Sequence, residues 1–435
     1  MLFARRSCWR GRDDIQDKLS DNREASRLAA PFVLNLPAFP RLVWVLLGGT
    51  LLIRTAVFLV WPFVAIILQQ RFGLPPSEIG IVLGSAALSS SVTGFYLGNL
   101  SDRFGRRKLM LAGCAGSVAA LVLLATADTP ALYALGAILI GICRASIESP
   151  ASALISETVP DQSLRELAFH ARYFLSNIGA SFGPLMGFVF GLATQQRTFL
   201  MTALAYTIFG LMLAHAFHGI PEKLRSDAKQ TARFSSALRT VNNDHRLLMV
   251  ILATFLTYVA YAQVESTLVQ YLNLNGGGNG IALATAVFFT NGLTIILFQF
   301  PLLRLLRPYD LNLRIQAGMA LFVAGFLAYS FLPVGALAGW IAATWVLSMG
   351  EAILFPTLNL QADRLAPEHL KGSYFGAITL AGLGFAAGPL LGGVMLQYLG
   401  GPVTFVLTAL ITLLGGASYW QSSRMRMAAA IDRAS

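Results

Sequence analysis

The sequence predicts an all-α membrane protein with twelve transmembrane helices in two pseudo-symmetric six-helix bundles. Its composition, the length of its apolar segments and an internal repeat are the observations that predict this fold class. Hydrophobic residues make up 55% of the 435 residues and charged residues only 12%, about half the share found in soluble domains. The apolar residues form long uninterrupted blocks, which excludes a soluble enzyme, a disordered chain and a coiled coil.

Twelve apolar segments are separated along the chain by glycines, prolines and charged residues. A helix needs about 20 apolar residues to cross the hydrocarbon core of a bilayer. In chain order we expect helices at residues 42–68, 78–98, 109–127, 131–154, 168–191, 198–217, 247–271, 281–303, 313–332, 336–360, 373–397 and 402–420. Because twelve is an even number, both termini are expected on the same side of the membrane.

The basic residues predict which side that is. The connections at residues 70–77, 128–130, 192–197, 272–280, 333–335 and 398–401 hold only Arg71 and Arg197 out of 32 Lys and Arg residues. Nearly all the others lie in the tails, in the alternate connections or at their helix ends, so both termini are predicted to be cytoplasmic. The formal net charge of +11 therefore reflects orientation in the membrane, and no nucleic-acid partner is expected.

A repeated motif divides the segments into two halves. The pattern Gly-x-x-x-Gly-Pro-x-x-Gly occurs at Gly179, Gly183, Pro184 and Gly187 and, 205 positions later, at Gly384, Gly388, Pro389 and Gly392. Duplicated halves are common in secondary transporters. We expect a cytoplasmic N-terminal tail at residues 1–40, bundles at 41–217 and 247–420, a cytoplasmic linker at 218–246 and a cytoplasmic C-terminal tail at 421–435. The first 40 residues lack a signal-peptide core and are expected to be either a functional tail or the product of a start codon assigned too early.

A charged motif lies between the second and third segments. It contains Gly98, Asp102, Arg103, Gly105 and Arg106. Its glycines allow a tight cytoplasmic turn, and its basic residues can pair with acids or with anionic lipid headgroups. On physical grounds alone it is an ordinary positively charged loop.

The spacing G-x-L-x-D-R-x-G-R-R resembles the signature loop of the major facilitator superfamily, and the resemblance covers residues 41–420. Arg144 in the fourth segment and the Gly-Pro motif of the fifth resemble the drug:proton antiporter branch, although Ile147-Glu148 stands where a glycine is usual. Residues 350–356 and 372–375 are most similar to bacterial multidrug-resistance transporters of the MdtH kind. The resemblance implies a multi-pass protein of the bacterial inner membrane, and we expect a monomer.

The resemblance also implies roles for these motifs. Asp102 would face the N-terminus of the eleventh helix near Ser373 and latch the two halves, and Arg106 would pair with an acid at the end of the fourth helix, Glu157. Pro308 stands 206 positions after Asp102, so the latch is expected to be asymmetric. The Gly-Pro motifs would kink the fifth and eleventh helices at the half-to-half interface, and tight packing without a gating role is the alternative.

Five ionisable residues lie inside predicted helices: Arg54, Arg144, Glu148, Glu265 and Glu351. Each costs about 2.5–3.5 kcal/mol near the membrane centre if it is unpaired. Arg144 and Glu148 are four residues apart and can pair directly, with a purely structural ion pair as one explanation. The resemblance places the first, fourth, seventh and tenth helices around the transport cavity, and these helices carry all five charges. We therefore expect Glu148 or Glu351 to carry a proton that Arg144 or Arg54 displaces.

Other side chains are candidates for contact with the substrate. Glu265 is expected to attract a cationic substrate, and Phe58, Trp61, Tyr258 and Tyr261 are expected to offer it an aromatic surface. Lipid-facing or core positions are the alternative for these aromatic residues. His170 and Arg172 are expected to be anchors at the membrane interface.

Together these patterns favour a secondary transporter that exports small amphipathic molecules, drugs or metabolites, in exchange for protons. The expected partners are a small-molecule substrate, protons and the lipid bilayer. Three cysteines without a Cys-x-x-Cys pair predict no metal site, and the lack of a nucleotide-binding motif predicts no ATP site or other cofactor. No nucleophile–base pair or metal cluster is found, so no enzyme activity is expected. A proton-coupled importer of a sugar or peptide is the alternative within transport, and a non-transporting sensor or scaffold is the alternative outside it.

Overall fold

The computed structural model describes residues 39–218, 244–365 and 378–431, and within them only the backbone of residues 95, 97–104, 359–360, 362–364 and 426–431. All regular structure in these ranges is helical. Most of the predicted N-terminal tail and linker lies outside the described residues, as do Ser373 and residues 432–435.

The first half begins with a broken helix. The predicted segment 42–68 consists of α2 (Arg41–Phe58), a 3-10 turn η1 (Trp61–Phe63) and α3 (Val64–Phe72). Pro62 lies in the first turn of η1, where its missing N–H cannot continue the helix. The remaining helices of this half are α4 (Pro76–Phe104), α5 (Arg106–Thr126), α6 (Pro130–Thr158), α7 (Gln162–Val189) and α8 (Thr198–Ala216).

The second half repeats this order. It contains α10 (His245–Glu265), α11 (Thr267–Asn275), η2 (Gly277–Asn279), α12 (Gly280–Leu306), α13 (Leu311–Phe331), α14 (Leu337–Leu365), η4 (Thr379–Leu383) and α16 (Gly384–Ile431). Gly400 has non-helical dihedral angles, with φ at 77° and ψ at 168°, and divides α16 into two helices. The second of these continues past the predicted end at residue 420 to Ile431.

All twelve predicted segments are helical in the part of the chain that the structure describes, and residues 373–377 of the eleventh lie outside that part. Within the described residues, nine helical stretches are long and apolar enough to cross a membrane. α4 and α7 are not among these nine. The last stretch, Thr379–Met425, contains the break at Gly400 and so holds two segments. The predicted fold class is therefore confirmed.

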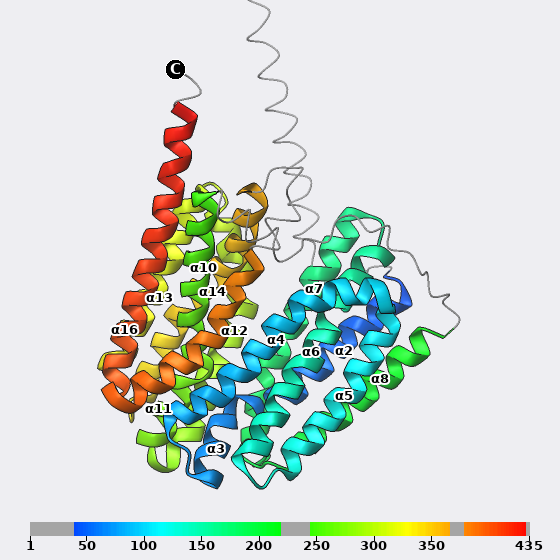
Figure 1. Cartoon of the computed structure of the whole chain (residues 1–435). Helices are drawn as coiled ribbons and strands as arrows, with labels where there is room; N and C mark the ends of the chain where they lie inside the picture. The colour runs from blue at the N-terminus through cyan, green and yellow to red at the C-terminus, as the bar shows by residue number, and fades with distance from the viewer. Residues whose placement is uncertain (1–38, 219–243, 366–377, 432–435) are drawn as a thin grey trace, which may run out of the picture. The chain divides into compact units, whose positions relative to one another are not determined.

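Helix packing repeats between the halves (Figure 1). In the first half α2 packs on α7 and α8, α6 packs on α4 and α5, and α5 packs on α8. In the second half α10 packs on α16, α14 packs on α12 and α13, and α13 packs on α16. The halves meet through α4 against α16 and through α7 against α12, so the contacts between them are also related by the repeat.

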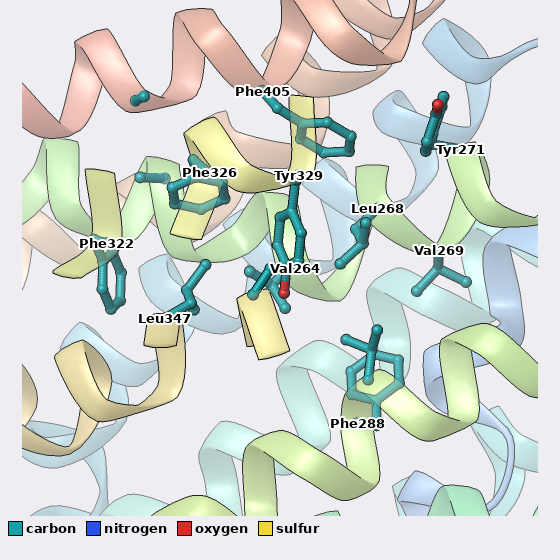
Figure 2. Close-up of a cluster of buried hydrophobic side chains, with 14 of the residues drawn as sticks. Val264, Leu268, Val269, Tyr271, Phe288, Phe322, Phe326, Tyr329, Leu347 and Phe405 are labelled. Atoms are coloured by element: carbon teal, nitrogen blue, oxygen red, sulfur yellow. The ribbon is translucent and has the colours of Figure 1, made fainter. Parts of the chain in front are cut away.

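A buried aromatic cluster holds α13, α14 and α16 together in the second half. Figure 2 shows Tyr329 among Phe326, Leu347 and Phe405. The Tyr329 ring stacks on Trp340 with centroids 5.2 Å apart, and its hydroxyl lies 2.8 Å from Thr344 Oγ1. These contacts fix α14, which carries Glu351 one turn after Leu347.

The tight turn predicted around residues 98–108 is wrong for most of its length. α4 stays helical through Phe104, and only Gly105, with φ at 88°, interrupts the chain before α5. Continuing the helix satisfies the backbone hydrogen bonds of this charged segment, and a glycine tolerates the positive φ that then reverses the chain.

Candidate transport site

An arginine–glutamate cluster joins α2 to α6. Glu148 Oε1 accepts a hydrogen bond from Arg54 Nη2 at 3.2 Å and lies 3.7 Å from Arg144 Nε. The direct pairing of Arg144 with Glu148 that their spacing predicts is therefore confirmed. These three side chains are 30–41% exposed, because they border cavities inside the protein.

The first Gly-Pro motif places Arg54 in this cluster. A Cβ added at Gly179 would lie 2.7 Å from Arg54 Cβ, and one added at Gly183 would lie 2.7 Å from Phe58 Cβ. Gly187 in the same way faces the Leu59 carbonyl. The glycines let α7 approach the turn of α2 that carries Arg54.

The second motif does the same for α16 and α10. Gly384 faces Phe255 and Tyr258, Gly388 faces Val259 and Ala262, and Gly392 faces Gln263 and Thr267. The motif helices do lie at the half-to-half interface, since α7 packs on α12 and α16 packs on α4. The motif glycines themselves face α2 and α10 of their own half. The helices continue without a break through Pro184 and Pro389.

Neighbouring positions on the same two helices contact the other half. Ser181 Oγ on α7 donates to the Phe289 carbonyl on α12 at 3.3 Å. Pro389 and Gly393 on α16 lie against Gly80 on α4. Each motif helix thus packs closely on its own half with one face and on the opposite half with another.

Further contacts close the halves at the end where α3 and α11 lie. Asn273 Nδ2 donates to Gln69 Oε1 at 2.5 Å, and the Ser77 backbone N–H donates to Gln397 Oε1 at 3.1 Å. This end is the one predicted to face away from the cytoplasm, and we call it the outer end. The end at which α2 begins is called the inner end.

Two cavities flank the charge cluster. The inner cavity, of about 330 Å³, lies among α2, α6, α7 and α8 in their inner-end halves. The outer cavity, also of about 330 Å³, lies in the outer-end half and is lined by both bundles. Arg54, Arg144 and Tyr206 line both cavities and so form the wall between them.

The expectation that Arg172 is an interfacial anchor is wrong. Arg172 lines the inner cavity, and its Nη1 donates to Ser152 Oγ at 2.7 Å. Its position early in α7 resembles that of a membrane-surface anchor, so only the packing of α7 on α2 and α6 shows that the side chain turns inward. The His170 ring lies edge-on to Phe300 of the other half, with centroids 6.3 Å apart.

The outer cavity contains most of the predicted substrate residues. Phe58, Trp61, Tyr261 and Glu265 all line it. The Glu265 side chain is exposed within this cavity and interacts electrostatically with Arg144 and Arg54. Tyr258 does not line it and instead stacks on Phe385 with centroids 4.5 Å apart.

Glu351 lies apart from the arginines. It is 4% exposed and accepts a hydrogen bond from Asn291 Nδ2 at 2.6 Å, and the same amide donates to Ser348 Oγ at 2.9 Å. Tyr261 also hydrogen-bonds this carboxyl group. No described cation lies within ion-pair distance of it, and α14 lines neither cavity. In this conformation Glu351 is therefore not paired with Arg54 or Arg144, and displacement of its proton by an arginine stays a prediction.

Asn291 is a site residue that the sequence analysis missed. It is a polar side chain within the apolar helix α12. A polar group inside a membrane helix needs a partner and is often functional, and this was the signal available in the sequence.

The predicted latch is described only in part. Arg106 Nη1 and Glu157 Oε2 form an ion pair 2.5 Å long between α5 and α6, and Gly105 precedes α5. The side chains of Gly98, Asp102 and Arg103 lie outside the described residues, as does Ser373. Contact of Asp102 with the eleventh helix therefore stays a prediction.

The family model of the Major Facilitator Superfamily matches residues 46–382, which is most of the chain. The chain belongs to the major facilitator superfamily. This facilitator is a multi-pass secondary transporter and not an enzyme. Within the described residues no group of three or more His, Cys, Asp or Glu side chains is arranged to hold a metal ion.

Several bacterial facilitators are similar to this one along most of their length. An uncharacterized transporter of Bacillus subtilis, YqjV, is 28% identical over 383 residues, 86% of this chain and 91% of that protein. A Na⁺, Li⁺, K⁺/H⁺ antiporter of Planococcus maritimus is 22% identical, with 86% of this chain and 93% of that protein covered. The multidrug resistance protein MdtH of Shigella dysenteriae is 25% identical, with 83% and 86% covered, and is thus a distant relative.

The fold is similar to that of solved facilitator structures. The nucleoside transporter NupG, in a structure of a mutant form, matches with a TM-score of 0.76 at 11% identity, with 88% of this chain and 99% of that chain covered. At this identity the likeness concerns the fold alone.

Proposed function

We propose that the protein exports small amphipathic molecules across the bacterial inner membrane in exchange for protons, with both termini in the cytoplasm. The observation that carries the proposal is Glu351, a buried acid hydrogen-bonded to Asn291 and Tyr261. Alternating access between the inner and outer cavities is the expected mode of transport.

Glu351 is better suited than Glu148 to carry the proton. Glu148 lies against two guanidinium groups, so its negative charge is compensated in place. Glu351 has only neutral described partners, and burying an unpaired carboxylate costs several kcal/mol. We assign Glu351 the proton-carrying role and Glu148 the role of holding Arg54 and Arg144.

A connection between the two acids runs through Glu265. Glu265 interacts electrostatically with Arg144 and Arg54 on one side and with Glu351 on the other. Tyr261 lines the outer cavity and contacts Glu351. Gain or loss of the proton on Glu351 thereby alters the electrostatic potential in the outer cavity. This couples protonation of Glu351 to substrate binding.

The energy of one proton is sufficient for export. A proton that enters down about 150 mV releases roughly 3.5 kcal/mol, at about 2.3 kcal/mol per 100 mV. This sustains an outward gradient of about 300-fold for a neutral substrate. The names of two relatives, a cation/H⁺ antiporter and a multidrug resistance protein, favour exchange with protons and outward transport.

Everted membrane vesicles energised by respiration test the proposal. Adding a panel of amphipathic drugs and metabolites should release protons from the acid lumen, seen as dequenching of a ΔpH-sensitive dye, only in vesicles that contain the protein. If compounds of the panel accumulate in these vesicles without release of protons, antiport is contradicted. Accumulation of a sugar or peptide by right-side-out vesicles under an inward proton gradient would favour an importer instead.

A further inference from the structure

The inner cavity carries an excess of positive charge. The charged residues that line it are Arg54, Arg144, Arg172 and a single acid, Glu148. Three guanidinium groups thus face one carboxylate. Uncompensated charge in a partly desolvated site is costly, so such a site favours a ligand that brings the missing negative charge.

The hydrogen bonds leave part of these guanidinium groups available. Arg54 and Arg144 both approach the same oxygen of Glu148, Oε1. The buried Nε of Arg144 is 3.7 Å from it, beyond hydrogen-bond distance, and makes no hydrogen bond to any described group. Arg172 donates to Ser152, which is a neutral partner.

The nearest further acid still leaves one positive charge. Glu265 interacts with Arg144 and Arg54 from the outer cavity. With Glu265 included, the three arginines face two described carboxylates, those of Glu148 and Glu265. A ligand with one negative charge would make this group of side chains neutral.

We propose that the substrate is an amphipathic organic carboxylate with one negative charge, which rests on the export function proposed above. The planar guanidinium groups of Arg144 and Arg172 match a carboxylate in shape and can donate in pairs to it. The apolar body of the ligand lies against the hydrophobic and aromatic part of the cavity wall, formed by Leu46, Ile53, Ile147, Phe169 and Phe209. This replaces the cationic substrate that Glu265 alone had suggested.

The two cavities give the carboxylate a direction of travel. Arg54 and Arg144 line both cavities, Arg172 lines only the inner one and Glu265 only the outer one. An anion that passes from the inner to the outer cavity keeps two guanidinium partners and loses Arg172. Repulsion from Glu148, which lines only the inner cavity, is replaced by repulsion from Glu265. Binding is therefore strongest at the inner end, and release is favoured at the outer end.

Ligand binding to the purified full-length protein in detergent tests the substrate class without a proton gradient. The probes are 1-naphthoate, 1-naphthylmethylammonium and neutral 1-naphthalenemethanol, which differ chiefly in charge, and affinity is measured by thermal shift and equilibrium dialysis. We expect naphthoate to bind at least about tenfold more tightly than the other two. R172Q should weaken naphthoate about tenfold or more, and R172K, which keeps the charge, about threefold.

The matched control is R71Q, which removes an exposed arginine at the outer end of α3. It should leave naphthoate affinity unchanged, and the melting temperature of each variant without ligand shows that it is folded. Tighter binding of the ammonium probe, or equal naphthoate affinity in wild type and folded R172Q, overturns the proposal. The binding assay uses no proton gradient, so either result would contradict the carboxylate substrate without contradicting proton-coupled export. Naphthoate that binds the purified protein but releases no protons in everted vesicles would contradict proton-coupled export without contradicting the substrate class.

Discussion

At the scale of single residues, Asn291 decides how Glu351 is held. Its amide is 2.6 Å from the carboxyl group. A hydrogen bond to the ionised form of a carboxyl group contributes about 1.5–3 kcal/mol. We expect N291L to slow proton-driven transport about tenfold or more, because the buried acid loses its amide donor. The initial rate of ΔpH-driven uptake into everted vesicles measures this.

A second asparagine is the control. N275A removes an amide that donates to the Tyr271 carbonyl at the end of α11, away from Glu351, and should transport at a rate within about twofold of wild type. Equal rates in N291L and wild type would show that the amide has no part in coupling.

The sequence predicted some contacts between residues and not others. Arg144 meets Glu148 because four residues on a helix bring side chains to one face. The contact of Arg54 with Glu148 spans 94 positions and depends on how α2 packs on α6, which no local pattern encodes. The separation of Glu351 from the arginines depends in the same way on the packing of the two halves.

At the scale of helices, the glycine rows set how closely neighbours pack. A Cβ at Gly183 would lie 2.7 Å from Phe58 Cβ and 2.9 Å from the Thr55 carbonyl oxygen. We expect G183V to lower the free energy of unfolding by about 1–3 kcal/mol, because α7 must move away from α2. Thermal unfolding of the purified protein in detergent measures this.

Gly48 on α2 offers the matched control, since a Cβ there meets nothing within 4 Å. G48A should be neutral or slightly stabilising, because alanine favours a helix over glycine. If G183V melts at the same temperature as G48A, α7 does not pack on α2 as described.

The sequence predicted the positions of the helices better than it predicted the residues at which they end. Long apolar blocks must cross the bilayer as helices, so all twelve segments are helical wherever the structure describes them. Their ends depend on backbone angles, and two of the reversals fall at Gly105 and Gly400, both with positive φ. The motif at residues 98–108 contains both Gly98 and Gly105, and the sequence does not show which of them adopts a positive φ. The turn falls at Gly105, so α4 continues to Phe104, further than predicted.

At the scale of the whole molecule, the contacts at the outer end must break for transport. The Gln69–Asn273 hydrogen bond joins the two halves there. In a variant with alanine at all three native cysteines, Q69C and N273C together should react with a short reducible dithiol crosslinker. We expect crosslinking to reduce transport by about tenfold or more and dithiothreitol to restore it, because the halves can no longer open outward.

The two single-cysteine variants treated with the same reagent are the controls, and both should keep transporting. Transport at the wild-type rate by a fully crosslinked protein would contradict opening at this end.

The repeat predicted two similar halves. Which contacts hold them together at one end depends on conformation, which a repeat does not encode.

Proton coupling through Glu351 is tested most directly in reconstituted proteoliposomes, with a substrate identified in the vesicle screen. E351Q should still exchange substrate for substrate at equilibrium but should lose its ΔpH-driven accumulation. E148Q, where folded, should keep that accumulation, because Glu148 neutralises arginines and carries no proton. Undiminished ΔpH-driven accumulation by E351Q would contradict the assignment of Glu351 as the proton carrier.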